Sequence, residues 1–266
     1  MYEGECLGII GQNGSGKSTL VKLITGLLRP SAGEIRHRGE DLTRLRVAQI
    51  AQRIGLVLQN PDYQLFNVTA LEEVRFGLRN LGLPADEVER RARRSLAAVG
   101  LEAAADHFPF RLSFGDRRRL AVAAVLAMEP EILILDEPTT AQDYRGRYLL
   151  ADLAEALRAQ GRTVIMISHD MELVAHYATR VVVLWEGRVL TQGRPHEVFA
   201  QEELLERTKL RPPQIAPVVR ALAEAGVPAE AVSLERLLAA LEPAAGRGAR
   251  GAAREAAGFV REAEGA

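Results

Sequence analysis

The sequence predicts an α/β protein whose core is a mostly parallel β-sheet, with an inserted helical subdomain and a small helical appendage near the C-terminal end. Short apolar runs have the length and continuity of strands buried on both faces of a parallel sheet: 6–10, 54–58, 132–135 and 163–167. Segments with helical spacing of apolar residues separate these runs, most clearly 61–112 and 144–159. Such an alternation of strands and helices is typical of an α/β fold.

Length and composition limit the functions that this chain can have. Its 266 residues suffice for one sizeable domain and an appendage, and a net charge of −1 offers no electrostatic basis for binding nucleic acid. No apolar run approaches the roughly 20 residues that span a bilayer, and residues 1–20 lack a signal-peptide pattern. The single cysteine, Cys6, excludes an internal disulfide and is expected to be a small core residue in a reducing cytosol.

The segment after the first apolar run predicts a phosphate-binding loop. Gly11, Gly16, Lys17 and Ser18 form the pattern G-x-x-x-x-G-K-S between a strand and an amphipathic helix. The glycines permit a tight turn whose backbone N–H groups face a phosphate, and the helix adds its positive N-terminal end. Lys17 is then placed to bridge the outer phosphates, and the Ser18 hydroxyl to bind Mg²⁺.

A second element of the same site follows the apolar run 132–135. A buried strand that ends in Asp136 and Glu137 presents two carboxylates at the carboxyl edge of the sheet, where ligands bind in open α/β folds. Asp136 is expected in the magnesium shell. Glu137 is expected to orient and deprotonate the attacking water. Together the two elements predict an enzyme that binds ATP with magnesium and hydrolyses it.

Five segments in a fixed order extend this prediction to a family: GQNGSGKST at 11–19, Gln59, LSFGD at 112–116, LILDEP at 133–138 and SHD at 168–170. The chain resembles the ATP-binding cassette (ABC) ATPases, whose core is a P-loop NTPase fold. The resemblance implies a second ABC ATPase, in a homodimer or a heterodimer, which closes head to tail over two ATP molecules.

The resemblance also assigns roles residue by residue. Gln59 is implied as a ligand of magnesium and water, His169 as a contact of the γ-phosphate, and Asp143 as a residue of the dimer interface. Ser113 and Gly115 of LSFGD are implied to serve the ATP of the partner subunit. The nucleotide bound by the chain itself is assigned to the loop residues Asn13, Gly14, Ser15, Gly16, Lys17, Ser18 and Thr19.

The signature departs from the family pattern LSGGQ at two positions. Phe114 replaces the usual glycine, and Asp116 replaces the usual glutamine. A bulky ring and an acid beside a phosphate seat would each weaken the closure over ATP. A degenerate cassette in a heterodimer is therefore one alternative, although Glu137 and His169 are both present.

A finer resemblance concerns the segment QNPDYQLF at 59–66 and the region 204–241, which look like those of energy-coupling factor ATPases. It implies a transmembrane coupling subunit, a substrate-binding membrane subunit for a vitamin or metal ion, and a peripheral location on the cytoplasmic face of the cell membrane. The alternative from another class is a soluble ABC-type ATPase with a regulatory or translation-associated role.

The expected domain organisation follows. Residues 1–200 form the ATPase domain, with a helical subdomain at about 60–116; residues 201–242 form a helical extension, and 243–266 a disordered tail. Relatives carry further N-terminal strands and an aromatic residue that stacks on adenine. We expect the ATPase domain of this chain to lack them.

Overall fold

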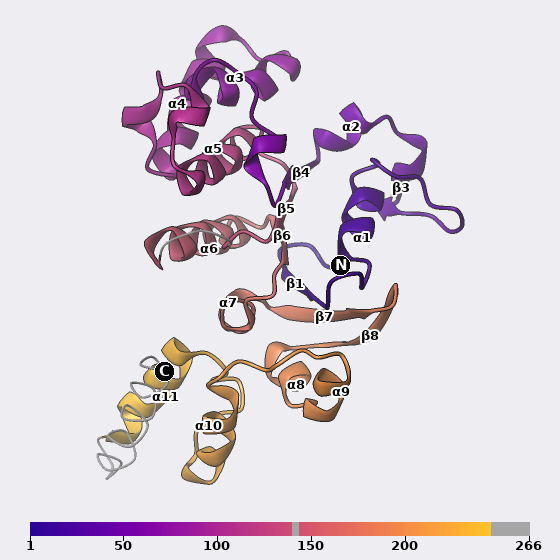
Figure 1. Ribbon diagram of the computed structural model, residues 1–266, viewed down its shortest axis with the longest axis vertical. Coiled ribbons are helices and arrows are strands. Elements are labelled where there is room, and N and C mark those ends of the chain that lie inside the picture. The colour runs from indigo at the N-terminus through magenta and orange to yellow at the C-terminus, as the bar shows by residue number, and fades with distance from the viewer. Residues whose placement is uncertain (140–143, 246–266) are drawn as a thin grey trace.

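The computed structural model describes residues 1–139 and 144–245, and Figure 1 shows their arrangement. Its main sheet has six strands in the order β4-β5-β6-β1-β7-β8, all parallel except β8, which pairs antiparallel with β7. The mostly parallel sheet predicted from the sequence is thereby confirmed. The strands of this sheet are β1 (Cys6–Ile10), β4 (Ile54–Val57), β5 (Ile132–Asp136), β6 (Thr163–Ile167), β7 (Arg180–Trp185) and β8 (Arg188–Gly193).

A separate two-stranded hairpin, β2 (Arg36–His37) and β3 (Glu40–Asp41), lies outside this sheet. The helices of the first half of the chain are α1 (Lys17–Ile24), α2 (Val47–Ala51), α3 (Ala70–Asn80), α4 (Ala85–Ala98) and α5 (Phe114–Ala127). Those of the second half are α6 (Tyr144–Ala159), α7 (Met171–Tyr177), α8 (Pro195–Phe199), α9 (Glu202–Arg207), α10 (Ala216–Ala221) and α11 (Leu234–Ala245).

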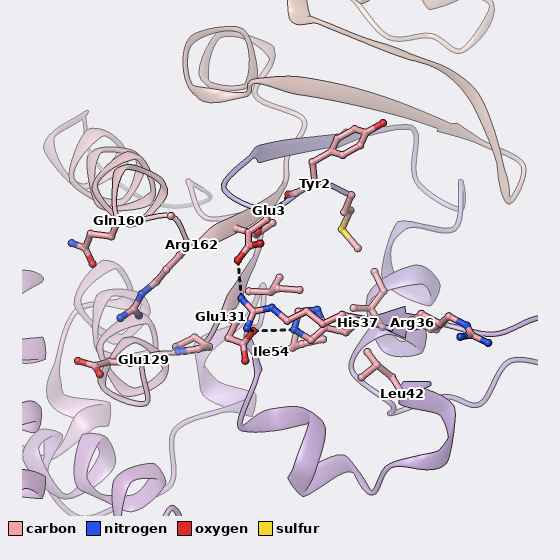
Figure 2. Close-up of a pocket in the computed structure, with 18 residues that line it drawn as sticks. Tyr2, Glu3, Arg36, His37, Leu42, Ile54, Glu129, Glu131, Gln160 and Arg162 are labelled. Atoms are coloured by element: carbon pink, nitrogen blue, oxygen red, sulfur yellow. Dashed lines mark hydrogen bonds and ion pairs between the residues drawn. The ribbon is translucent and has the colours of Figure 1, made fainter. Parts of the chain in front are cut away.

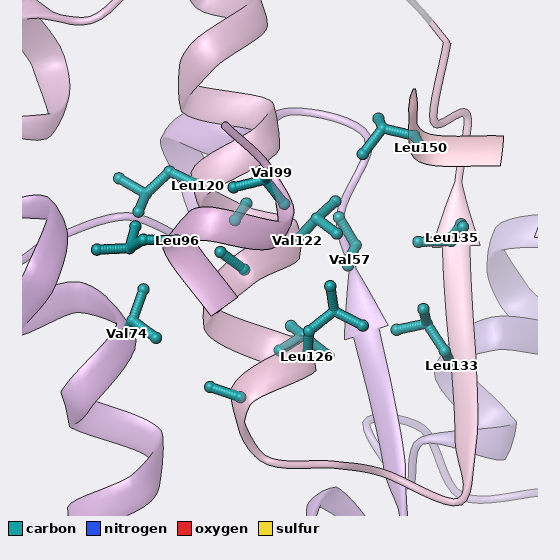
Figure 3. Packing of buried hydrophobic residues seen from close by; sticks show 14 of the residues in the cluster. Val57, Val74, Leu96, Val99, Leu120, Val122, Leu126, Leu133, Leu135 and Leu150 are labelled. Carbon is teal, nitrogen blue, oxygen red and sulfur yellow. The ribbon is translucent and has the colours of Figure 1, made fainter. Parts of the chain in front are cut away.

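The two faces of the sheet are covered by different helices because side chains alternate along each strand. On β5, Ile132 and Ile134 belong to a core with Val21 and Ile24 of α1. Leu133 and Leu135 point to the other face, where Figure 3 shows them near Leu150 of α6 and the side chains of α5. Burial on both faces explains why these strands are continuous apolar runs in the sequence.

The inserted helices α3, α4 and α5 form a lobe beside the β4–β5 end of the sheet, as Figure 1 shows. Their shared core contains Val74, Leu96 and Leu120, all buried (Figure 3). Thr69 caps α3 by accepting a hydrogen bond from the Glu72 amide. Both ends of this lobe connect to strands that carry predicted site residues, since β4 precedes it and β5 follows it.

The region 201–242, expected to be helical, contains α9, α10 and most of α11. Helix α11 runs to Ala245, so residues 243–245, which we expected in the disordered tail, are helical. The rest of the predicted tail, 246–266, lies outside the described residues. Among the described helices, none combines the length and apolar character required to cross a bilayer.

Candidate active site

The loop after β1 has the conformation that its glycines permit. Gly14 and Gly16 adopt φ angles of 82° and 104°, in the region that favours glycine. A Cβ atom at Gly11 would lie 2.5 Å from the Leu184 carbonyl oxygen and 2.6 Å from Ser15 Oγ. The loop therefore packs closely against the end of β7, and its outer surface remains open.

Lys17 begins α1 and folds back over this loop. Its Nζ atom donates to the carbonyl oxygens of Gly11, at 2.6 Å, and Gln12, at 2.9 Å. Burial lowers the pKa of Lys17, and the carboxylates of Glu137 and Asp136 oppose that shift. The ammonium is thus held at the mouth of the loop, facing two acids.

The two acids stand where β5 ends. Burial, and then the neighbouring charge of Glu137, raise the pKa of Asp136 above its ordinary value, against the opposing effect of Lys17. Glu137 is only 7% exposed and has a φ angle of 50°, which is rare for a residue with a Cβ atom. Strained backbone of this kind is concentrated at functional sites.

Glu137 and His169 are brought into direct contact, although 32 positions separate them in the chain. His169 Nδ1 lies 2.8 Å from Glu137 Oε1, and the His169 amide donates to Glu137 Oε2 at 3.4 Å. The Glu137 amide in turn donates to the Ile167 carbonyl of β6 at 2.8 Å. The histidine side chain is 71% exposed, so its free edge remains accessible to a ligand.

Arg118 of α5 is a site residue that the sequence analysis missed. Its side chain is fully buried, and its guanidinium donates to the backbone carbonyl oxygens of Asp136, at 3.0 Å, and Glu137. Burial lowers the pKa of this arginine, whereas the two acids raise it. Arg118 therefore ties the helix that LSFGD opens to the backbone of both acids. The run of three arginines at 117–119 was the only signal in the sequence.

One cavity of about 760 Å³ brings most of the predicted residues together. It is lined by the predicted residues Asn13, Gly14, Gly16, Lys17, Ser18, Thr19, Gln59, Asp136, Glu137 and His169, and also by Gly11, Gln12, Lys209 and Leu210. The carboxyl ends of four strands, β1, β4, β5 and β6, and the first turn of α1 thus converge on this cavity.

Three of the predicted residues do not line this cavity, and a fourth is not described. Ser15 is buried beneath the loop, where its Oγ atom has no hydrogen-bond partner and does not line the cavity. Ser113 and Gly115 are outside the cavity lining, at the start of α5. Asp143 lies outside the described residues. The roles proposed for these four residues stay predictions.

Side chains that follow Gln59 connect its loop to α5. Asp62 Oδ1 lies 2.8 Å from Arg117 Nε. Gln64 accepts from the Leu58 amide at 3.1 Å and donates to the Ala121 carbonyl at 3.3 Å. The segment 59–66 is therefore a bridge between the end of β4 and the helix that carries the LSFGD motif.

The LSFGD motif itself caps α5. The Asp116 amide donates to Ser113 Oγ at 3.1 Å, and the Ser113 hydroxyl donates to Asp116 Oδ2 at 2.8 Å. Arg119 forms an ion pair with the same carboxylate. The guanidinium of Arg117 lies 5.6 Å from the centre of the Phe114 ring. The Ser113 hydroxyl, for which the sequence predicts a phosphate contact, is thus hydrogen-bonded to Asp116.

The cavity fits a magnesium–nucleotide ligand by its donor types. Lys17 supplies an ammonium, Ser18 a hydroxyl, and Gln59 an amide oxygen, while Asp136 adds a carboxylate. Oxygen donors of these kinds suit Mg²⁺, which keeps several waters and is held together with substrate phosphates. In the described residues, no cluster of three histidine, cysteine or acidic side chains forms a site for a metal alone.

A second cavity, of about 480 Å³, lies at the opposite ends of the strands (Figure 2). It is bordered by the first residues of β4, β5 and β6, and contains the contact between His37 and Glu131, at 3.0 Å. Arg38 connects Glu3 and Glu131 across it. It has no glycine loop, and ligands of such sheets bind at the carboxyl ends, so we do not assign the nucleotide there.

Fold and cavity define the class of this protein as a P-loop nucleoside triphosphatase. The family profile described as "ABC transporter" matches residues 1–140, and the chain belongs to that family of ABC ATPases. The Energy-coupling factor transporter ATP-binding protein EcfA2 of Symbiobacterium thermophilum is 46% identical over 244 residues, which cover 90% of this chain and 85% of that protein. EcfA of Methanocaldococcus jannaschii is 40% identical over a stretch that covers 83% of this chain and 80% of that protein.

Solved structures agree with this assignment. CbiO1 of Clostridium perfringens, described as part of the ABC transporter complex cbiONQ, has a TM-score of 0.69 and 39% identity, over 84% of this chain and 89% of that chain. An ATP-binding cassette in a dimeric post-hydrolysis state bound to ADP and Pi has a TM-score of 0.68 and 30% identity. The match covers 73% of this chain and 87% of that chain. The resemblances found in the sequence, to ABC ATPases and to the energy-coupling factor group, are confirmed.

Proposed function

We propose that this chain is the ATP-binding and ATP-hydrolysing subunit of an energy-coupling factor transporter that imports a vitamin or a metal ion. The observation that carries the proposal is the single cavity in which Lys17, Asp136, Glu137 and His169 meet. The names of the similar proteins support the transporter type. The cytoplasmic face of the membrane is the location that this role requires.

In the proposed reaction, Glu137 accepts a proton from the water that attacks the γ-phosphorus of ATP. The new P–O bond forms as the bond to the β–γ bridging oxygen breaks, and ADP leaves with the electron pair. His169, 2.8 Å from Glu137, orients the carboxylate and presents its free edge to the departing phosphate. Lys17 balances the charge of the phosphates, and Mg²⁺, when bound near Ser18, Gln59 and Asp136, would neutralise further charge.

Hydrolysis by the purified chain tests this proposal. We expect E137Q to bind Mg·ATP but to lose turnover by at least about 100-fold, because the general base is removed. K17A should lose binding as well, since the ammonium that faces the phosphates is gone. Turnover of E137Q within twofold of the wild type would contradict the role of Glu137.

A membrane subunit is the proposed partner, and an exposed apolar patch beside Gln59 supports it. Tyr63, Phe66, Val68 and Phe76 form this docking patch, with exposures of 82%, 60%, 72% and 44%. The rings of Phe66 and Phe76 meet edge to face, with their centroids 4.8 Å apart. Apolar side chains gathered at a surface mark interaction sites, and an apolar helix of a coupling subunit suits this one.

One observation favours a weaker variant of the same function. The Ser113 hydroxyl donates to the Asp116 carboxylate, so this hydroxyl is not free to bind a phosphate of the nucleotide on the partner subunit. In a heterodimer, the site completed by this motif would then hydrolyse slowly, while the site built on Glu137 remains active. Separate mutation of Glu137 and Ser113 distinguishes the two sites.

A further inference from the structure

The cavity contains a second lysine that the family resemblance does not assign. Lys209 lines it together with Lys17, although it follows α9, near the other end of the chain. The sequence has only three lysines, and the third, Lys22, lies on the exposed side of α1. Two of the three therefore face the same cavity.

The backbone at Lys209 adopts a conformation that does not favour lysine. Its φ angle is 50°, in the left-handed region. The Lys209 amide donates to the Glu206 carbonyl at 2.8 Å, and the Leu210 amide to the Leu205 carbonyl at 2.9 Å, the two bonds of a Schellman cap. Glycine is usual at this position because a Cβ atom is disfavoured there. A lysine therefore does not stabilise this turn, and a backbone conformation of this kind is typical of residues whose side chain has a function.

The turn is held firmly beside the phosphate-binding loop. Leu205 and Leu210 are buried in one apolar cluster with Ile10, the last residue of β1 before Gly11. The Gln214 amide donates to Glu172 Oε1 at 2.6 Å, and Glu172 lies in α7, three positions after His169. The position of Lys209 is therefore fixed by the same two elements that position the loop and the histidine.

We propose that Lys209 binds a phosphate group of the nucleotide in this cavity, so that the C-terminal extension contributes directly to the ATP site. The inference rests on the proposed function, because it requires a ligand with phosphates. Even with Mg²⁺ on the triphosphate, the carboxylates of Asp136 and Glu137 outweigh the single charge of Lys17, so part of the negative charge stays uncompensated. A second ammonium on a long stem supplies the missing charge.

Binding of the non-hydrolysable analogue AMP-PNP with Mg²⁺, measured by titration calorimetry on the purified chain, tests the proposal. We expect K209Q and K209G to bind roughly tenfold more weakly, the value of one charge-assisted contact at an exposed site. K209R keeps the charge and should stay within about threefold of the wild type. K22Q removes the same charge outside the cavity and should bind normally.

K209G separates a phosphate contact from a structural role. Glycine fits the left-handed turn better than lysine, so the melting temperature of K209G should equal or exceed that of the wild type while binding weakens. Normal binding by K209Q and K209G, or binding by K209R as weak as by K209G, would overturn this inference alone. Failure of the wild type to bind AMP-PNP would overturn the proposed function with it.

Discussion

The role of Arg118 gives the sharpest prediction for a residue outside the cavity. R118M replaces a fully buried guanidinium by a shorter, unbranched apolar side chain, and leaves the carbonyl oxygens of Asp136 and Glu137 without this donor. Each charge-assisted bond contributes about 1.5–3 kcal/mol. Part of this is offset because the charge no longer has to be buried. We therefore expect the free energy of unfolding to fall by about 2–4 kcal/mol.

For a domain of this size, that loss lowers the melting temperature by roughly 5–15 °C. The strained backbone of Glu137, with its φ angle of 50°, also loses its anchor, so the carboxylate no longer faces the water. We expect kcat to fall by about 10- to 100-fold, with KM for ATP changed less than about threefold, because ground-state binding depends on the loop and Lys17.

Thermal unfolding and steady-state ATP hydrolysis measure both effects. R93M is the matched control, because Arg93 is an exposed arginine of α4 that pairs only with Glu89 among the described residues. It should shift the melting temperature by no more than about 2 °C. A stable, fully active R118M protein would refute the idea that this arginine holds the two acids in place.

Two further predictions concern the core and the signature. Burial raises the pKa of the Cys6 thiol to about 12, so iodoacetamide at pH 8 should label it only after unfolding, as mass spectrometry can show. Because the unfolded thiol ionises near pH 9, its contribution to stability declines as pH rises from about 9 to 12. D116Q should free the Ser113 hydroxyl and strengthen ATP-dependent association about three- to tenfold, as sedimentation would measure; unchanged association would argue that Asp116 does not occupy a phosphate seat.

Much of the site could be predicted because each part is coded locally. An apolar run followed by glycines predicts a strand and a phosphate loop, and a run that ends in two acids predicts a carboxylate pair at the sheet edge. Parallel strands bring such ends together whatever their separation in the chain. Glu137 and His169 meet because β5 and β6 are adjacent parallel strands that end at the same edge of the sheet.

Other residues depend on tertiary contacts that have no local signature. Arg118 stands in a run of three arginines, and only the packing of α5 against the sheet decides which one is buried. Lys209 follows a short helix with an ordinary sequence, and its left-handed turn is stabilised by Leu210 in a core built from distant strands.

The molecular mass of E137Q in solution, with and without Mg·ATP, tests most directly whether ATP joins two copies of this site. Light scattering coupled to gel filtration measures the mass, and bound nucleotide is counted in the same peak. We expect a monomer of 29.1 kDa without ATP and a dimer with two ATP molecules in its presence. A monomer that retains one tightly bound ATP would contradict the claim that ATP joins two copies, since the LSFGD motif would then contact no nucleotide.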